Sequence, residues 1–152
     1  MPRVSRYLAR GCGCYRHTEG MDRMGRSELH YRALEGDLDG IRTRIAAGDS
    51  VGAPDYAGFT PLHFAAQQSQ SAAAAFLIEA GAPVDAQDKF GNTPLFKAVF
   101  GSRGQGDTVE ALLRAGANPD LPNHSGVAPR ALAQSIANYD ITQFLQAPLR
   151  SV

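Results

Sequence analysis

The chain has 152 residues, which fits one domain with a buried core, and its 15 Lys and Arg balance its 15 Asp and Glu. A formal charge of zero argues against a general nucleic-acid binder, and 43% hydrophobic residues argue against a disordered chain. No apolar run approaches the roughly 18–20 residues that cross a bilayer, so we expect neither nucleic acid nor a membrane as a partner.

Residues 1–21 form a basic segment that stands outside the patterns described below. The segment carries four Arg and one Glu, a local charge of +3, and lacks the apolar stretch of a secretory signal. We expect a disordered leader, or an extension upstream of a start at Met21 or Met24. Its Arg-rich, acid-poor character also faintly resembles a transit peptide.

The same segment holds Cys12 and Cys14, the two cysteines of the chain. Together with His17 they offer at most three zinc ligands, whereas a structural zinc site uses four. Two cysteines also give no disulfide framework. We therefore expect two incidental thiols and no metal site.

Glycines recur at a fixed interval along the rest of the chain. Three residue types keep a spacing of 33: Gly25, Gly58 and Gly91; Asp22, Asp55 and Asp88; Leu29, Leu62 and Leu95. A fixed period of this length indicates a stack of repeated units. The next glycine in register, Gly126, follows Gly91 by 35 residues, so the third unit has two extra residues, which we place in Gly101–Gly106.

The second unit shows what each repeat contains. Residues 55–58 predict a turn, because Asp can bond its own backbone and Gly accepts a positive φ. Thr60 is a helix N-cap and Pro61 suits the first helical position. A second helix is expected over 71–80, ended by Gly81. Each unit is therefore predicted to be turn, helix, helix and loop.

The repeats resemble ankyrin repeats. The second unit reads Gly-Phe-Thr-Pro-Leu-His-Phe-Ala-Ala at 58–66, and the third reads Gly-Asn-Thr-Pro-Leu-Phe-Lys-Ala at 91–98. The first unit has Ser-Glu-Leu-His at 27–30 instead. The last departs at three of the four core positions and ends in a loose helix over 140–146, as in a terminal capping repeat.

The resemblance covers roughly residues 22–147, with a tail at 148–152. The expected repeats span 22–54, 55–87, 88–122 and 123–147. The fold that the resemblance implies is all-α, an ankyrin-repeat solenoid of stacked helix-turn-helix units with protruding β-turn loops. We expect these apolar helix residues to be buried: Leu29, Leu38, Ile41, Ile45, Leu62, Phe76, Leu77, Leu95, Val99, Val109, Leu112, Leu113, Leu132, Ile141 and Leu145. The alanine-rich second helix of the second unit is expected to depend on Phe76, Leu77 and Ile78.

Two histidines occupy one repeat position. The resemblance implies that His30 bonds Ser27, that His63 bonds Thr60, and that both rings bond neighbouring backbone. A catalytic base needs a nucleophile beside it in a pocket, whereas periodic residues lie side by side along a stack. His124 falls at a turn tip, where ligand and solvated roles stay open. We expect no enzyme, no catalytic residue and no cofactor.

The resemblance implies a protein-binding face built from the turn tips and the ends of the first helices. The expected contact residues are Tyr56, Phe59, Gln67, Lys89, Phe90, Asn92, Phe100 and His124. Further candidates by the same rule are Arg23, Met24, Arg26, Ala57, Gln68, Ser125 and Val127. Aromatic side chains are favoured at binding hot spots, although the aromatic residues of this set also have packing between repeats as an alternative role.

The resulting expectation is a monomeric, cytoplasmic, non-enzymatic module that binds a protein through its concave face and turn tips. Small stand-alone ankyrin proteins of bacteria include inhibitors that neutralise a toxin, so the resemblance suggests an inhibitor or immunity protein. An intracellular scaffold or regulatory adaptor in a larger complex is the alternative. Residues 22–152 carry a formal charge of −3, which favours a basic protein partner over nucleic acid.

Overall fold

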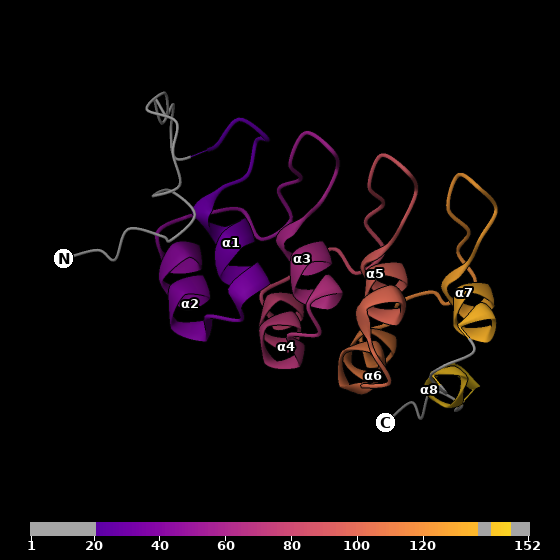
Figure 1. Ribbon diagram of the computed structural model, residues 1–152. Helices are drawn as coiled ribbons and strands as arrows, with labels where there is room; N and C mark the ends of the chain where they lie inside the picture. The colour runs from indigo at the N-terminus through magenta and orange to yellow at the C-terminus, as the bar shows by residue number, and fades with distance from the viewer. Residues whose placement is uncertain (1–20, 137–140, 147–152) are drawn as a thin grey trace.

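The computed structural model describes residues 21–136 and 141–146, and these fold into four helix pairs stacked side by side (Figure 1). The helices are α1 (Glu28–Glu35), α2 (Leu38–Ala46), α3 (Pro61–Gln67), α4 (Ser71–Glu79), α5 (Pro94–Gly101), α6 (Asp107–Arg114), α7 (Pro129–Ser135) and α8 (Thr142–Gln146). We number the units one to four by these pairs. The expected leader with its cysteines and His17, the start of the last helix at Asp140, and the tail lie outside the described residues.

The stack has two layers of helices and one row of turns. The first helices α1, α3, α5 and α7 pack on one another in order, and so do the second helices α2, α4, α6 and α8. The turns project beyond the first helices, all to the same side (Figure 1). We call the surface formed by the turns and the first helices the concave face. No helix of the described part is long and apolar enough to cross a membrane.

The turn glycines adopt the left-handed conformation that the repeat pattern predicted. Gly58 has a φ of 83°, and a Cβ added to it would lie 2.9 Å from the Asp88 Cα of the next turn. Glycine is therefore needed here both for the backbone angle and for the close approach of neighbouring turns. Gly81, with a φ of 97°, follows α4 in the expected way.

The core consists of one apolar cluster that runs through all four units. Most residues expected in it are buried, but Leu38 is 36% exposed, and Ile45, Phe76 and Leu132 are only half-buried. Leu38 is the first residue of α2, in which Ile41 is the buried residue. The expectation of full burial was wrong for these four residues.

The packing of α4 matches the expectation for Leu77, which is fully buried, whereas Phe76 and Ile78 are only partly buried against the core. Its buried residues are Ala73, Ala74 and Leu77. Small side chains let α4 lie close to its neighbours, so the large ring of Phe76 is displaced to the edge, 5.6 Å from the guanidinium carbon of Arg42. Alanine therefore fills the centre of this interface.

The extra residues of the third unit lie between its two helices. Five residues separate α5 from α6, whereas three separate α3 from α4. The longer connection contains two residues with positive φ, Arg103 at 48° and Gly104 at 89°. This connection places Arg103 at the edge of the concave face, beside the end of α5.

Candidate functional site

The turn tips are joined to one another by backbone hydrogen bonds. Three bonds of one kind link successive turns: Tyr56 N–H to the Met24 carbonyl (2.8 Å), Lys89 N–H to the Ala57 carbonyl (2.9 Å) and His124 N–H to the Phe90 carbonyl (2.9 Å). Each bond satisfies groups that a free loop would leave to water. The tips therefore form a continuous, braced edge rather than four independent loops.

Each turn is also closed internally by an acidic or amide side chain. Asp55 Oδ1 accepts the N–H groups of Ala57 and Phe59, both at 2.9 Å. Asp88 repeats this pattern one unit later, and Asn123 repeats it in the fourth unit. Aspartate recurs every 33 residues because its carboxylate holds the turn backbone.

His63 lies beneath the turns and joins two units. The Thr60 hydroxyl lies 2.9 Å from its Nδ1, which also accepts the Thr60 N–H, and its Nε2 lies 2.9 Å from the Asn92 carbonyl. An Nδ1 that accepts a backbone N–H places the ring proton on Nε2, which donates to Asn92. Burial lowers the pKa of His63 and keeps the ring neutral.

His30 makes the same contacts one unit earlier. Its Nδ1 lies 3.0 Å from the Ser27 hydroxyl, and its Nε2 lies 3.1 Å from the Phe59 carbonyl. Burial lowers the pKa of His30 as well. The expected pairs of each histidine with Ser27 or Thr60 are confirmed, and both rings are engaged in holding turns to helices.

Cations and aromatic rings form a cluster at the centre of the concave face. The guanidinium carbon of Arg26 lies 4.9 Å from the Phe64 ring centroid, and Lys97 Nζ lies 4.7 Å from the Phe59 ring centroid. The two rings are 5.6 Å apart. We call these four residues the cation–aromatic cluster. Distances of this size allow attraction between each cation and its ring.

The cluster stands above two buried carboxylates. Arg26 Nε lies 2.9 Å from Asp55, and Lys97 Nζ lies 3.6 Å from Asp88. Both carboxylate side chains are fully buried, whereas both cations keep part of their surface in water. The acidic groups of the second and third turns are thus used internally, and only their cationic partners reach the surface.

Sequence reasoning missed Phe64 and Lys97. They are 33 residues apart and each follows the residue in the histidine position of its unit. The repeat register alone therefore identifies them as equivalent positions on the first helices. Phe64 is aromatic and Lys97 is cationic, so comparison of the two units did not reveal that each side chain contacts the turn of the preceding unit.

Three of the predicted aromatic residues are strongly exposed. Tyr56, Phe100 and Phe90 expose 79%, 69% and 54% of their surface. The Tyr56 ring covers Gly25 of the preceding turn, and Lys89 Nζ lies 5.0 Å from the Phe90 ring centroid. Exposed aromatic rings are favoured at protein-binding surfaces.

The other predicted contact residues divide into two groups. Gln67, Lys89 and His124 are exposed, and Phe59 is partly buried in the cation–aromatic cluster. Asn92 is buried instead, because its amide donates to Asp88 and accepts from Asn123 within the row of turns. Asn92 thus has a supporting position and offers little surface for contact.

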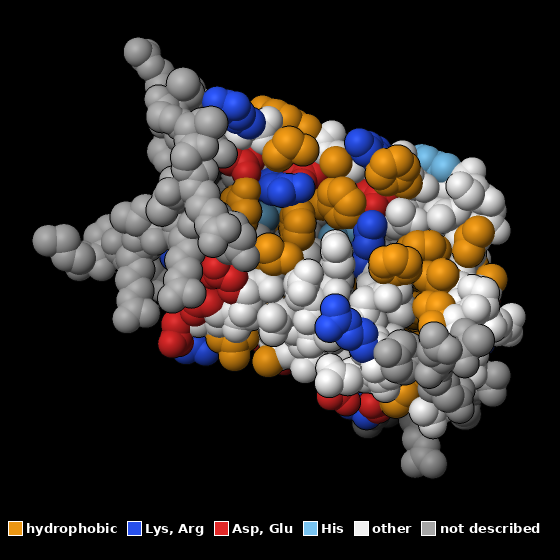
Figure 2. Space-filling view, in the orientation of Figure 1, with side chains coloured by type: hydrophobic (Ala, Val, Ile, Leu, Met, Phe, Trp, Pro, Cys, Tyr) orange, Lys and Arg blue, Asp and Glu red, His pale blue; other side chains and the backbone are white. Residues whose placement is uncertain are grey.

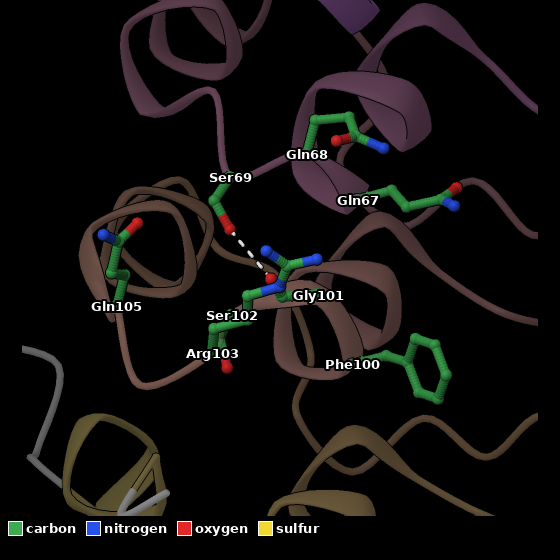
Figure 3. Close-up of a pocket in the computed structure, with 8 residues that line it drawn as sticks. All are labelled: Gln67, Gln68, Ser69, Phe100, Gly101, Ser102, Arg103 and Gln105. Carbon is green, nitrogen blue, oxygen red and sulfur yellow. Dashed lines mark hydrogen bonds between the residues drawn. The ribbon is translucent and has the colours of Figure 1, made fainter.

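A polar groove of about 500 Å³ opens where α3 and α5 end. It is lined by Gln67, Gln68, Ser69, Phe100, Gly101, Ser102, Arg103 and Gln105 (Figure 3). The Ser69 hydroxyl donates to the Gly101 carbonyl at 3.2 Å and joins the two helix ends. Among these lining residues Arg103 carries the charge, so the groove extends the cationic surface from the turns toward the helix ends.

Metal or acid–base chemistry finds little support in the described residues. Over 21–136 and 141–146, no group of three or more His, Cys, Asp or Glu side chains is placed to hold a metal ion. In His30 and His63, both ring nitrogens are engaged in hydrogen bonds with groups of the turns and helix caps. The arrangement is suited to binding.

Comparison with known proteins agrees with this geometry. A family model described as ankyrin repeats (3 copies) matches residues 29–123, more than half of the chain. No curated protein sequence matches the chain. Ankyrin repeats are typically non-catalytic domains that bind other proteins. The all-α stack of helix pairs, its braced row of turns and the family match together show that this chain belongs to the ankyrin-repeat family.

Proposed function

We propose that this protein binds a protein partner across the second and third units of the concave face and inhibits it, as an immunity protein neutralises a toxin. The observation that carries this proposal is the exposure of Tyr56, Phe90 and Phe100 on a braced scaffold. Rigid, exposed aromatic rings lose little conformational entropy on binding and bury a large apolar area.

Occlusion is the mode of inhibition that such a surface supports. The concave face presents rings, cations and amides, and its buried histidines are committed to the turns. A partner held here is blocked by contact alone. A scaffold or adaptor would use the same face but would leave the partner active.

The test compares three forms of the full chain as bait in affinity purification from its native cells after chemical cross-linking. The forms are the unmodified protein, Tyr56→Ala/Phe90→Ala, and Leu38→Ala, which removes an exposed apolar side chain from α2. The supporting result is a protein retained by the unmodified chain and by Leu38→Ala but lost from the double variant. Circular dichroism checks that all three forms remain folded.

The recovered partner then separates the two roles. Loss of its activity on addition of the unmodified chain supports the inhibitor. Unchanged activity in a stable complex supports the scaffold or adaptor instead. Retention of the partner by Tyr56→Ala/Phe90→Ala contradicts the proposed face.

A further inference from the structure

We infer that the partner segment occupying the second and third units of the concave face is acidic, with Asp or Glu side chains interspersed among apolar ones. This inference rests on the proposed function and specifies the chemistry of its partner. It reverses the expectation of a basic partner that the net charge of residues 22–152 suggested.

The acidic groups of this part of the concave face are withdrawn from the surface. Asp55 and Asp88 are fully buried and accept backbone N–H groups of their own turns. Asn123 replaces the acid in the next turn. A partner that lies across these turns therefore meets no exposed carboxylate from them.

The cationic groups remain at the surface. Lys89 and Arg103 are exposed, and within the described residues neither forms an ion pair with a carboxylate. Arg26 and Lys97 stay partly exposed above their buried partners. In Figure 2, blue side chains lie interleaved with orange ones over the turns, with red only in small areas between them, while a larger red area lies over the first unit.

Among the described residues, the acidic side chains outside the turns lie mainly on the second helices and the connecting loops, with Glu28 and Glu35 of α1 as the exceptions. Glu79 ends α4, and Asp107 and Glu110 belong to the first turn of α6. These helices form the layer behind the first helices (Figure 1). Much of the net negative charge of residues 22–152 thus lies outside the turns of the second and third units, so this net charge is a poor guide to the surface that a partner meets there.

Because each of these cations lies beside an aromatic ring, we expect the partner segment to present a carboxylate next to an apolar side chain. Lys89 lies beside Phe90, and Lys97 lies beside Phe59. A carboxylate of the partner reaches the cation while a neighbouring apolar side chain covers the ring. Beyond them, Arg103 stands in the groove with Gln67 and Gln68, where its planar guanidinium can bind a further carboxylate through two hydrogen bonds.

The first arm of the test uses random copolymers as defined probes and the full chain as receptor, followed by fluorescence anisotropy. The probes are a glutamate–tyrosine copolymer, a lysine–tyrosine copolymer and a single-stranded oligothymidylate. We expect the glutamate–tyrosine copolymer to bind roughly tenfold more tightly than either alternative, and to weaken as salt rises. Tighter binding of the lysine copolymer, or equal binding of the oligothymidylate, overturns the inference.

The second arm compares two variants with the same change in charge. Lys89→Gln/Arg103→Gln alters the concave face, and Arg42→Gln/Arg114→Gln alters α2 and α6 behind it. We expect roughly a fivefold or greater loss of glutamate–tyrosine affinity in the first and less than about twofold in the second. Equal losses in the two variants would mean unspecific attraction and would refute the site.

Binding of the natural partner by the variants distinguishes failure of this inference from failure of the proposed function. If Tyr56→Ala/Phe90→Ala loses the partner but Lys89→Gln/Arg103→Gln binds it with full affinity, the face binds protein and the acidic character is wrong. If neither variant loses the partner, both proposals fail. Loss in both, with retention by Arg42→Gln/Arg114→Gln, supports both.

Discussion

Lys97 Nζ lies 4.7 Å from the ring centroid of Phe59, on the turn one unit earlier and 38 residues before it. The pair Arg26 and Phe64 has the same spacing, but there the cation belongs to the turn and the ring to the helix. Each contact thus ties the turn of one unit to the first helix of the next. The same residues that stiffen the stack also give its concave face alternating cationic and aromatic surface.

The contact between Lys97 and Asp88 should contribute to stability. Lys97→Met keeps the aliphatic stem but removes the ammonium 3.6 Å from a fully buried carboxylate. We expect a loss of about 1 kcal/mol in the free energy of unfolding, less than for a fully buried pair because Lys97 is partly exposed. Urea unfolding followed by circular dichroism measures it.

Lys89→Met is the matched control for that change. Lys89 also lies beside a ring, but it is exposed and has no carboxylate partner among the described residues. We expect a change within about 0.5 kcal/mol. A loss as large as that of Lys97→Met would show that the buried carboxylate is not the cause.

The close approach of neighbouring turns predicts a difference between two glycines of the same repeat position. Gly58→Ala and Gly126→Ala both place an alanine at a φ near 80°, which costs about 1–2 kcal/mol. In Gly58→Ala the added Cβ would also lie 2.9 Å from the Asp88 Cα. A Cβ added at Gly126 has nothing within 4 Å. We expect Gly58→Ala to lower the melting temperature clearly more. Equal shifts would contradict tight packing between the turns.

The displaced ring of Phe76 predicts a smaller effect than full burial would give. Phe76→Ala should lower the free energy of unfolding by about 1–2 kcal/mol, against about 3–5 kcal/mol for a fully buried Phe. Leu77→Ala, at a fully buried position of the same helix, should lower it by about 3 kcal/mol. Denaturant unfolding of both variants checks the order, and a greater loss at Phe76 would place that ring in the core.

The repeat period predicted the parts of the structure that recur in each unit. It located the turn glycines and the helix starts, because both depend on local backbone geometry, whereas the pairing of His63 with Thr60 came from the resemblance to ankyrin repeats. It did not predict the contact of Phe59 with Lys97, since that contact joins positions of unlike residue type in different units. Net charge likewise does not reveal the charge of one face, because a sum over residues ignores which carboxylates are buried, as Asp55 and Asp88 are.

The two buried histidines predict loss of stability in mild acid. Burial lowers the pKa of both His30 and His63 in the folded protein, whereas an unfolded histidine titrates near pH ~6.5. The unfolded chain therefore binds protons that the folded chain resists, so stability is full above about pH 6.5 and falls as the pH drops below it. Urea midpoints at about pH 7.5, 6.5 and 5.5 should decrease in that order, above the range near pH ~4 where carboxylates titrate. His63→Gln, which cannot gain a proton, should start less stable but show a shallower decline, and an unchanged slope would exclude His63 as its source.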